Sequence, residues 1–200
     1  MLLLGITGGI GSGKSYVAHL MQSHWGIPVY DCDAAARRLE NDDPLLRAAL
    51  VKAAGPEVYD ARSGQLARSV LARFLFTSDE NAAVVNRIVH PAVQRDLLRW
   101  AEGQAAHLLA VESAILYESG FDAMVDRVIF VDAPDEVRLL RAMQRDGASR
   151  SQIAARMARQ DSARYKAGAH YLIRNDACTT TDELIAQIAA IPEISQLQKL

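Results

Sequence analysis

A glycine-rich segment near the N-terminus constrains the fold of this chain more than any other feature. Residues 8–15 are Gly-Gly-Ile-Gly-Ser-Gly-Lys-Ser, which fits the pattern G-x-x-x-x-G-K-[ST] without a mismatch. A short apolar run, residues 2–6, precedes this segment and suits a buried parallel strand. Apolar residues at helical spacing, Val17, Leu20 and Met21, follow it. A strand, a glycine loop and a helix in this order predict a phosphate-binding loop.

The residue types of the loop suit a nucleoside triphosphate. Phosphate oxygens require many donors at short range, and glycines let backbone N–H groups approach without obstruction by side chains. The helix that follows directs its unpaired N–H groups and positive dipole end to the same place. Lys14 can reach the β- and γ-phosphates, and the Ser15 hydroxyl can be a ligand of Mg²⁺. The predicted nucleotide-binding residues of the loop are Gly9, Ile10, Gly11, Ser12, Gly13, Lys14, Ser15 and Tyr16.

Composition predicts an ordinary globular protein. The chain has 200 residues, half of them hydrophobic, which suffices for one compact α/β domain with insertions. The net charge of −2 argues against general nucleic-acid binding. Two cysteines, Cys32 and Cys178, are too few for a disulfide framework. No apolar run approaches the roughly 18 residues that cross a bilayer. We therefore expect a soluble cytoplasmic protein without a membrane or nucleic-acid partner.

Carboxylates stand at the ends of three predicted strands. Asp31 and Asp33 follow the strand at residues 27–30, Glu112 ends residues 107–112, and Asp132 ends residues 128–132. The carboxyl ends of parallel strands line the ligand crevice, so these acids are candidates for metal or hydroxyl contacts. Asp is also a favoured helix cap, and an alanine-rich segment follows Asp33. For Asp31 and Asp33 both interpretations remain open.

Two helical segments interrupt the predicted sheet. Residues 34–103 form a helical insertion in which Pro44 opens one helix, residues 70–75 and 84–89 mark two more, and Pro91 begins a fourth. Residues 138–166 hold eight Arg or Lys against two Asp, an excess of six positive charges. Three interpretations of this basic segment are open. It is a solvated surface, a lid that brings arginine over a transferring phosphoryl group, or a patch that binds nucleic acid. After a last strand, residues 171–173, a closing helix spans 182–191, and weak packing is expected from Pro192 onward.

These elements predict an α/β protein with a P-loop NTPase-type three-layer fold and a short parallel five-stranded sheet. A single domain comprises a core of residues 1–33, 104–137 and 167–200. The insertion at residues 34–103 is the expected acceptor-binding region, and residues 138–166 are the expected lid.

In this order, the motifs resemble those of the dephospho-CoA kinase family over nearly the whole chain. Residues 5–15 resemble the family's N-terminus, and Asp31, Asp33 and Arg37 its D-x-D-x-x-A-R element. His90 with Pro91 is similar to its H-P pair, and residues 116–120 to its loop that carries a glutamate. Further similar positions in and after the lid are Arg141, residues 143–147, Arg156, Gln160 and Asn175. Several positions depart from the family pattern: Tyr16 replaces Thr, Glu112 replaces a common Asp, and Ser113-Ala114 replace an apolar residue and Pro. Gln94 replaces a frequent Arg beside Arg95, and Arg138 replaces a frequent Gln.

The resemblance implies transfer of the γ-phosphoryl group of ATP, with Mg²⁺, to the ribose 3′-hydroxyl of dephospho-CoA. Lys14 and Arg141 would stabilise charge, and Asp33 would accept the hydroxyl proton. The implied partners are ATP and dephospho-CoA, in a monomer or weak homo-oligomer. Asp31, Asp33, Arg37, His90 and Glu118 would bind the acceptor, and Arg141 and Asn175 would bind the nucleotide.

Two other functions suit the same loop. One is a different small-molecule P-loop kinase that acts on a nucleoside, nucleotide or sugar. The other is a nucleotide-dependent switch protein, which would require a D-x-x-G element after a strand and an N-K-x-D base reader. Neither element occurs in the sequence.

Overall fold

The computed structural model describes residues 1–197 and divides into two compact units. The first unit comprises Met1–Tyr30 and Ala105–Leu200, and the second comprises Asp31–Gln104. The second unit therefore interrupts the first in sequence, close to the boundaries expected for the helical insertion.

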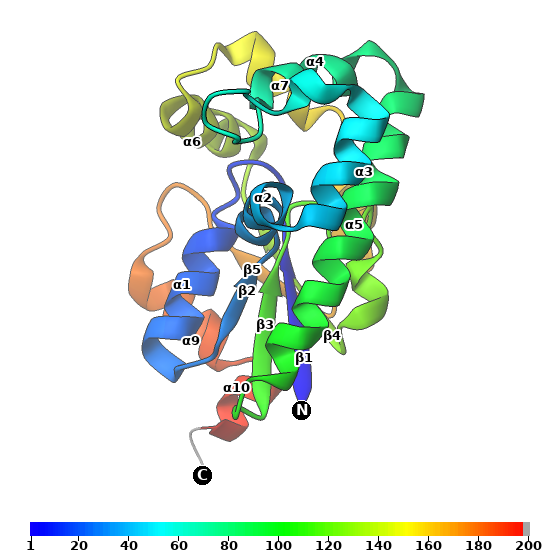
Figure 1. Cartoon of the computed structure of the whole chain (residues 1–200). Helices are drawn as coiled ribbons and strands as arrows, with labels where there is room; N and C mark the ends of the chain where they lie inside the picture. Colours follow the sequence, from blue (N-terminus) through cyan, green and yellow to red (C-terminus); the bar gives the residue numbers. More distant parts are fainter. Residues whose placement is uncertain (198–200) are drawn as a thin grey trace. The chain divides into compact units, whose positions relative to one another are not determined.

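The first unit is built on a five-stranded parallel sheet in the order β2-β3-β1-β4-β5 (Figure 1). The strands are β1 (Leu2–Thr7), β2 (Val29–Asp31), β3 (Leu108–Glu112), β4 (Arg127–Asp132) and β5 (Tyr171–Arg174). The central strand β1 pairs with β3 on one side and β4 on the other. The phosphate-binding loop thus leaves the middle of the sheet at its carboxyl edge.

The central strands are almost entirely buried, which explains their uninterrupted apolar sequences. Helices α1 (Lys14–Trp25) and α9 (Thr181–Ala189) pack on the sheet and on each other. On the sheet, Gly5 leaves room for a neighbouring turn, because a Cβ there would meet Leu116 at 3.0 Å and Val125 at 3.1 Å. Fully buried members of the core between these elements include Leu4, Ile6, Val17, Met21, Ile129 and Ile188.

The lid segment contains three helices of the first unit. These are α6 (Asp135–Asp146), α7 (Arg150–Met157) and α8 (Ser162–Ala167). Gly147, in the left-handed conformation with φ 62°, ends α6, and Ser149 begins α7 with a capping box. The 3₁₀ helix η2 (Phe121–Met124) follows the turns at residues 114–120.

The second unit is helical. It comprises α2 (Cys32–Asp42), α3 (Pro44–Ala54), the 3₁₀ helix η1 (Pro56–Val58), α4 (Arg68–Thr77) and α5 (Asp79–Glu102). Helices α2, α3 and α4 all contact α5. Hydrogen bonds fix the loop after η1, with the Tyr59 hydroxyl donating to the Glu40 carbonyl at 2.6 Å and Leu66 N–H donating to Asn41 Oδ1 at 2.8 Å.

The prediction that Pro91 begins a fourth helix in this unit is wrong. Helix α5 runs through Pro91 without ending. Val85, Val89, Val93 and Leu97 form one buried stripe at four-residue spacing on both sides of the proline. Continuous packing of this stripe outweighs the loss of one backbone hydrogen bond at an exposed proline.

The weak packing expected from Pro192 is also wrong for the residues that the structure describes. Helix α10 (Pro192–Leu197) places Ile194 in the core of the first unit, where it is fully buried. An apolar residue two positions after Pro192 is enough to anchor one helical turn. Residues 198–200, which the same prediction included, lie outside the described residues. Across residues 1–197, no helix combines the length and apolar character of a membrane span.

Candidate active site

The glycine loop adopts a conformation that requires its glycines. Gly11 and Gly13 have φ values of 77° and 92°, which L side chains rarely adopt. Ser12 N–H donates to the Gly9 carbonyl at 3.0 Å and closes the turn. Gly13 then caps α1, and its carbonyl accepts from the N–H groups of Tyr16 and Val17. The loop therefore delivers the start of α1 to the carboxyl edge of the sheet.

Three side chains converge where the loop enters α1. Glu112 Oε1 lies 3.7 Å from Lys14 Nζ and accepts a hydrogen bond of 3.2 Å from Ser15 Oγ. The pairing of β1 with β3 explains this contact, because Glu112 ends β3 directly beside Ile6 of β1. Lys14 and Glu112 are both buried, whereas Ser15 is exposed. Glu112 is thus a member of this site. Its position at a strand end had made it a candidate for metal or hydroxyl contacts without naming Lys14 or Ser15 as partners.

Asn175 and Arg141 meet at the other side of the loop. Asn175 is buried, and its Nδ2 donates to the Ser12 carbonyl at 2.8 Å. Arg141, on α6, donates to the carbonyl oxygens of Asn175 at 2.9 Å and Asp176 at 3.0 Å. In this structure Asn175 supports the loop directly, and Arg141 is bonded to the segment after β5.

Two lid residues that sequence reasoning left out of the site contact the loop directly. Arg138 Nε donates to the Ile10 carbonyl at 3.1 Å, and Ile10 N–H donates to Gln160 Oε1 at 2.8 Å. No local sequence pattern predicts these contacts, because the bonded residues are separated by 128 positions in one case and by 150 in the other. The signals available were the departure of Arg138 from the family's frequent glutamine and the similarity of Gln160 to the family's lid.

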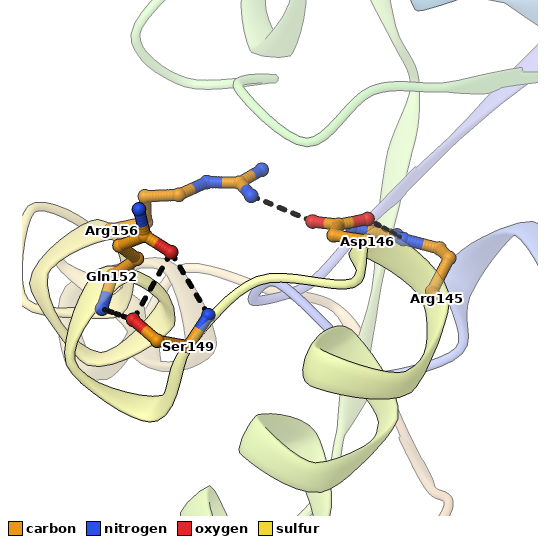
Figure 2. Close-up of polar contacts among 5 residues, drawn as sticks. All are labelled: Arg145, Asp146, Ser149, Gln152 and Arg156. Carbon is orange, nitrogen blue, oxygen red and sulfur yellow. Dashed lines mark hydrogen bonds and ion pairs between the residues drawn. The ribbon is translucent and has the colours of Figure 1, made fainter.

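The remaining charges of the lid are mostly paired at its surface. Figure 2 shows the turn between α6 and α7, where Asp146 accepts hydrogen bonds from Arg145 at 2.7 Å and Arg156 at 2.6 Å. Bonding to these two arginines, Arg145 first, lowers the pKa of Asp146 to about 2. Beside them, the Ser149 and Gln152 side chains form the capping box of α7. The positive excess of the segment therefore serves partly to hold the lid together.

Glu118 lies at the junction between the turns after β3 and helix α8. The Tyr117 and Tyr165 rings stack with centroids 4.9 Å apart. Burial, followed by a hydrogen bond to the Glu118 carboxylate, raises the pKa of Tyr165 to about 12. Glu118 is exposed, and it remains available to a ligand as well as to Tyr165.

The other predicted acceptor residues belong to the second unit. Asp31 Oδ1 accepts from Ala34 N–H at 2.9 Å, so Asp31 is the cap of α2. Asp33 and Arg37 are exposed on α2, and His90 is half-buried on α5. The capping role that the sequence allowed for either aspartate thus belongs to Asp31, which leaves the Asp33 carboxylate exposed in the first turn.

The fold and the loop define a P-loop kinase. A sequence model of the family described as Dephospho-CoA kinase matches residues 2–181. A curated dephospho-CoA kinase from Porphyromonas gingivalis is 43% identical over 177 residues, which are 88% of this chain and 86% of that protein. The chain belongs to the dephospho-CoA kinase family.

Two solved structures have a similar fold. A Thermus thermophilus protein of known crystal structure is 33% identical, with a TM-score of 0.79 and coverage of 100% of this chain and 97% of that chain. Dephospho-CoA kinase from Campylobacter jejuni, 23% identical with 97% of each chain covered, has the same fold with a TM-score of 0.67.

The activity follows from the family. The protein is a kinase that phosphorylates dephospho-CoA in the final step of coenzyme A synthesis, and the kinase family implies ATP as the phosphoryl donor. The expectation from the sequence motifs is thereby confirmed, and dephospho-CoA is favoured over the acceptors of other small-molecule kinases.

Proposed function

We propose that the γ-phosphoryl group of ATP is transferred to the ribose 3′-hydroxyl of dephospho-CoA at the phosphate-binding loop. The convergence of Lys14, Ser15 and Glu112 carries the proposal. Lys14 neutralises charge on the β- and γ-phosphates, and the N–H groups at the start of α1 bind their oxygens. Because Lys14 is buried beside Glu112, its charge acts in a poorly screened environment.

The residues beside Lys14 fit Mg²⁺. Ser15 Oγ and Glu112 Oε1 are hard oxygen donors that already lie 3.2 Å apart. Within residues 1–197 no group of three or more His, Cys, Asp or Glu could hold a metal ion. That finding suits an ion that retains several waters and binds one or two protein oxygens together with substrate phosphates. Bound Mg²⁺ would offset negative charge on the phosphates, with Ser15 as its ligand and Glu112 as a partner of its waters.

Asp33 is the proposed acid/base residue. Its carboxylate would accept a hydrogen bond from the 3′-hydroxyl, orient that oxygen and take its proton late in the transfer. Exposure of Asp33 in the first turn of α2 supports this role, since Asp31 performs the capping. Asp31, Arg37, His90 and Glu118 are proposed to bind other parts of the acceptor.

Arg141 and Asn175 are proposed to bind the nucleotide from the lid side. Two hydrogen bonds support this proposal, since Arg141 donates to the Asn175 carbonyl and Asn175 donates to the Ser12 carbonyl of the loop. Arg141 uses Nη1 and Nη2 to bind the carbonyls of Asn175 and Asp176, and its other N–H groups, or a rearrangement during lid motion, would bring its charge to the transferring group. The bonds that Arg141 makes here hold the segment after β5, which in turn bonds to the loop through Asn175.

We also propose a cytoplasmic location and a monomer or weak homo-oligomer. Cys32 and Cys178 are both free thiols, which suits a reducing compartment. Fractionation of cells that express the tagged protein, together with sedimentation of the pure protein, tests both statements.

The decisive experiment measures ADP release with and without dephospho-CoA and determines the phosphorylated position of the product by mass analysis and NMR. We expect ADP release only with the acceptor and Mg²⁺, and phosphate on the 3′-oxygen. Phosphate at another oxygen, or equal ADP release without acceptor, would contradict the proposal.

Asp33→Asn tests the acid/base assignment. Turnover should fall by about 10²- to 10⁴-fold because a positioned proton acceptor is lost, while ATP binding stays nearly intact. Asp42→Asn, at an exposed carboxylate on the same helix, is the matched control and should leave turnover unchanged. Near-normal turnover of Asp33→Asn would remove Asp33 from this role.

A further inference from the structure

Ile10, at a variable position of the loop motif, is held by the lid in three ways. Its N–H donates to Gln160 Oε1 at 2.8 Å, and its carbonyl accepts from Arg138 Nε at 3.1 Å. Its side chain packs against a small apolar cluster of the lid, formed by Leu139, Ala142 and Ile153. One residue of the loop is therefore fixed at both backbone groups and at its side chain.

These bonds fix the orientation of two successive peptide groups. In a planar trans peptide, the carbonyl and the N–H point in opposite directions. When Arg138 holds the Ile10 carbonyl, the N–H of Gly11 is turned to the opposite side of the loop. The preceding peptide is held at both ends, since Ile10 N–H donates to Gln160 and the Gly9 carbonyl accepts from Ser12 N–H.

The contact between α6 and the loop is close at two glycines. A Cβ on Gly9 would lie 2.0 Å from Arg138 Nη2, and one on Gly11 would lie 2.1 Å from the Arg138 carbonyl oxygen. Arg138 itself is buried, with 6% of its surface exposed, and Asp135 Oδ1 accepts from its Nη1 at 3.0 Å. The guanidinium is thus a fixed support under the loop and not a surface charge.

We propose that Arg138 and Gln160 are positioning residues that hold the Ile10 peptide groups in the orientation that binds phosphate. Nucleotide affinity then depends on two lid residues that act through the loop backbone and need not touch the nucleotide. The inference rests on the proposed nucleotide site at the loop. It also gives a physical meaning to the departure at position 138, because arginine and glutamine can both donate to the Ile10 carbonyl.

A matched pair of variants separates hydrogen bonding from packing. Arg138→Met keeps an unbranched chain but cannot donate, whereas Arg138→Gln keeps a donor. By titration calorimetry with Mg·ADP, we expect Arg138→Met to raise Kd about tenfold, the size of one charge-assisted hydrogen bond, and Arg138→Gln to stay within about threefold. In kinetics, Arg138→Met should raise KM for ATP with kcat and KM for dephospho-CoA little changed.

Gln160→Met tests the other half of the proposal and remains informative if Arg138→Met does not fold. It should raise Kd for Mg·ADP about fivefold, and the double variant should lose less than the product of the single losses, because both side chains act on Ile10. Arg150→Met is the control. Arg150 lies in the same lid and pairs with Glu136 at an exposed site, so its loss should not change Kd.

Each outcome decides the question. Wild-type affinity in Gln160→Met, or equal weakening by Arg138→Met and Arg138→Gln, would overturn the positioning role. If the wild-type protein itself fails to bind Mg·ADP, the proposed nucleotide site is wrong. Failure of the inference alone would leave wild-type binding intact, with Gln160→Met unchanged or the two Arg138 variants equally weakened.

Discussion

The phosphate-binding loop and the lid belong to one unit but are stabilised in opposite ways. The loop's polar contacts are buried: Ser12, Lys14 and Asn175 are exposed by only 1%, 8% and 6%. Apart from Arg138, which lies against the loop, the arginines of the lid's ion pairs are largely exposed, at 57% for Arg145, 61% for Arg150 and 50% for Arg156. Buried polar bonds are costly to break, whereas exposed ion pairs contribute little each.

This difference indicates a division of labour. A loop that binds phosphate must keep its N–H groups in place before the ligand arrives, so that catalysis requires little reorganisation. A lid must open for substrates to enter and products to leave, so its own contacts must be weak enough to exchange. The Ile10 junction is where the rigid part meets the movable part.

The largest effect should come from the loop's lysine. Lys14→Ala removes the charge beside the transferring phosphoryl group and leaves Glu112 buried without its cation. We expect kcat/KM for ATP to fall about 10²- to 10³-fold. Lys166→Ala is the contrast, because Lys166 is a half-exposed lysine of the lid that pairs with Asp132. An equally large fall of kcat/KM in Lys166→Ala would show that activity depends on this lysine of the lid as strongly as on the lysine of the loop.

A glycine pair tests the rigidity of the loop without removing any charge. In Gly13→Ala, a Cβ would lie 2.1 Å from Asn175 Nδ2 at a φ of 92°. Backbone strain and the displaced Asn175 bond should together lower the free energy of unfolding by about 2–4 kcal/mol.

Gly26→Ala is the control for this substitution. Gly26 has a φ of 63°, but within residues 1–197 no heavy atom beyond its chain neighbours lies within 4 Å of its Cβ position. Strain alone should cost about 1–2 kcal/mol in chemical denaturation. Equal losses at the two positions would mean that the loop tolerates displacement of Asn175 and is less rigid than its burial indicates.

Sequence reasoning succeeded where a local pattern has only one structural solution. The loop motif with its flanking apolar runs predicted β1, the loop and α1. The acids at three strand ends indicated the edge of the sheet, where the structure brings Glu112 to Lys14 and Ser15. The five-stranded parallel sheet followed from short apolar runs separated by helical segments.

Sequence reasoning failed where tertiary packing decides the local structure. Pro91 is an ordinary helix-start signal, but the buried stripe from Val85 to Leu97 carries α5 through it. Ile194 looked like part of a loose tail until its burial in the core fixed α10. The bonds of Arg138 and Gln160 to Ile10 depend on the packing of α6 against the loop, which no periodicity or spacing encodes.

Two capping boxes of the same kind extend the comparison to smaller effects. Thr180 with Glu183 begins α9, which carries Leu184 and Ile188 of the core, and Ser149 with Gln152 begins α7 in the lid. Thr180→Ala should lower the global free energy of unfolding by about 1 kcal/mol. Ser149→Ala removes the same kind of cap, but its effect should appear only as faster hydrogen exchange in α7, since the lid opens without global unfolding. A global loss of equal size in Ser149→Ala would make the lid part of the cooperative core.

The smallest effect concerns the pH dependence of the lid turn shown in Figure 2. Bonds from Arg145 and Arg156 lower the pKa of Asp146 from 3.8 to about 2. Because the folded pKa lies below the unfolded one, the stabilisation is present above about pH 4 and is lost as pH falls toward 2. Both arginines are half-exposed, so solvent screening limits the contribution to about 1 kcal/mol or less. Hydrogen exchange of α7 should therefore quicken below pH 4, beyond its intrinsic pH dependence, relative to the core helix α9. Asp146→Asn should show the faster relative exchange at every pH, and a wild-type lid that keeps its protection at pH 2.5 would show that the Asp146 pairs do not hold the turn.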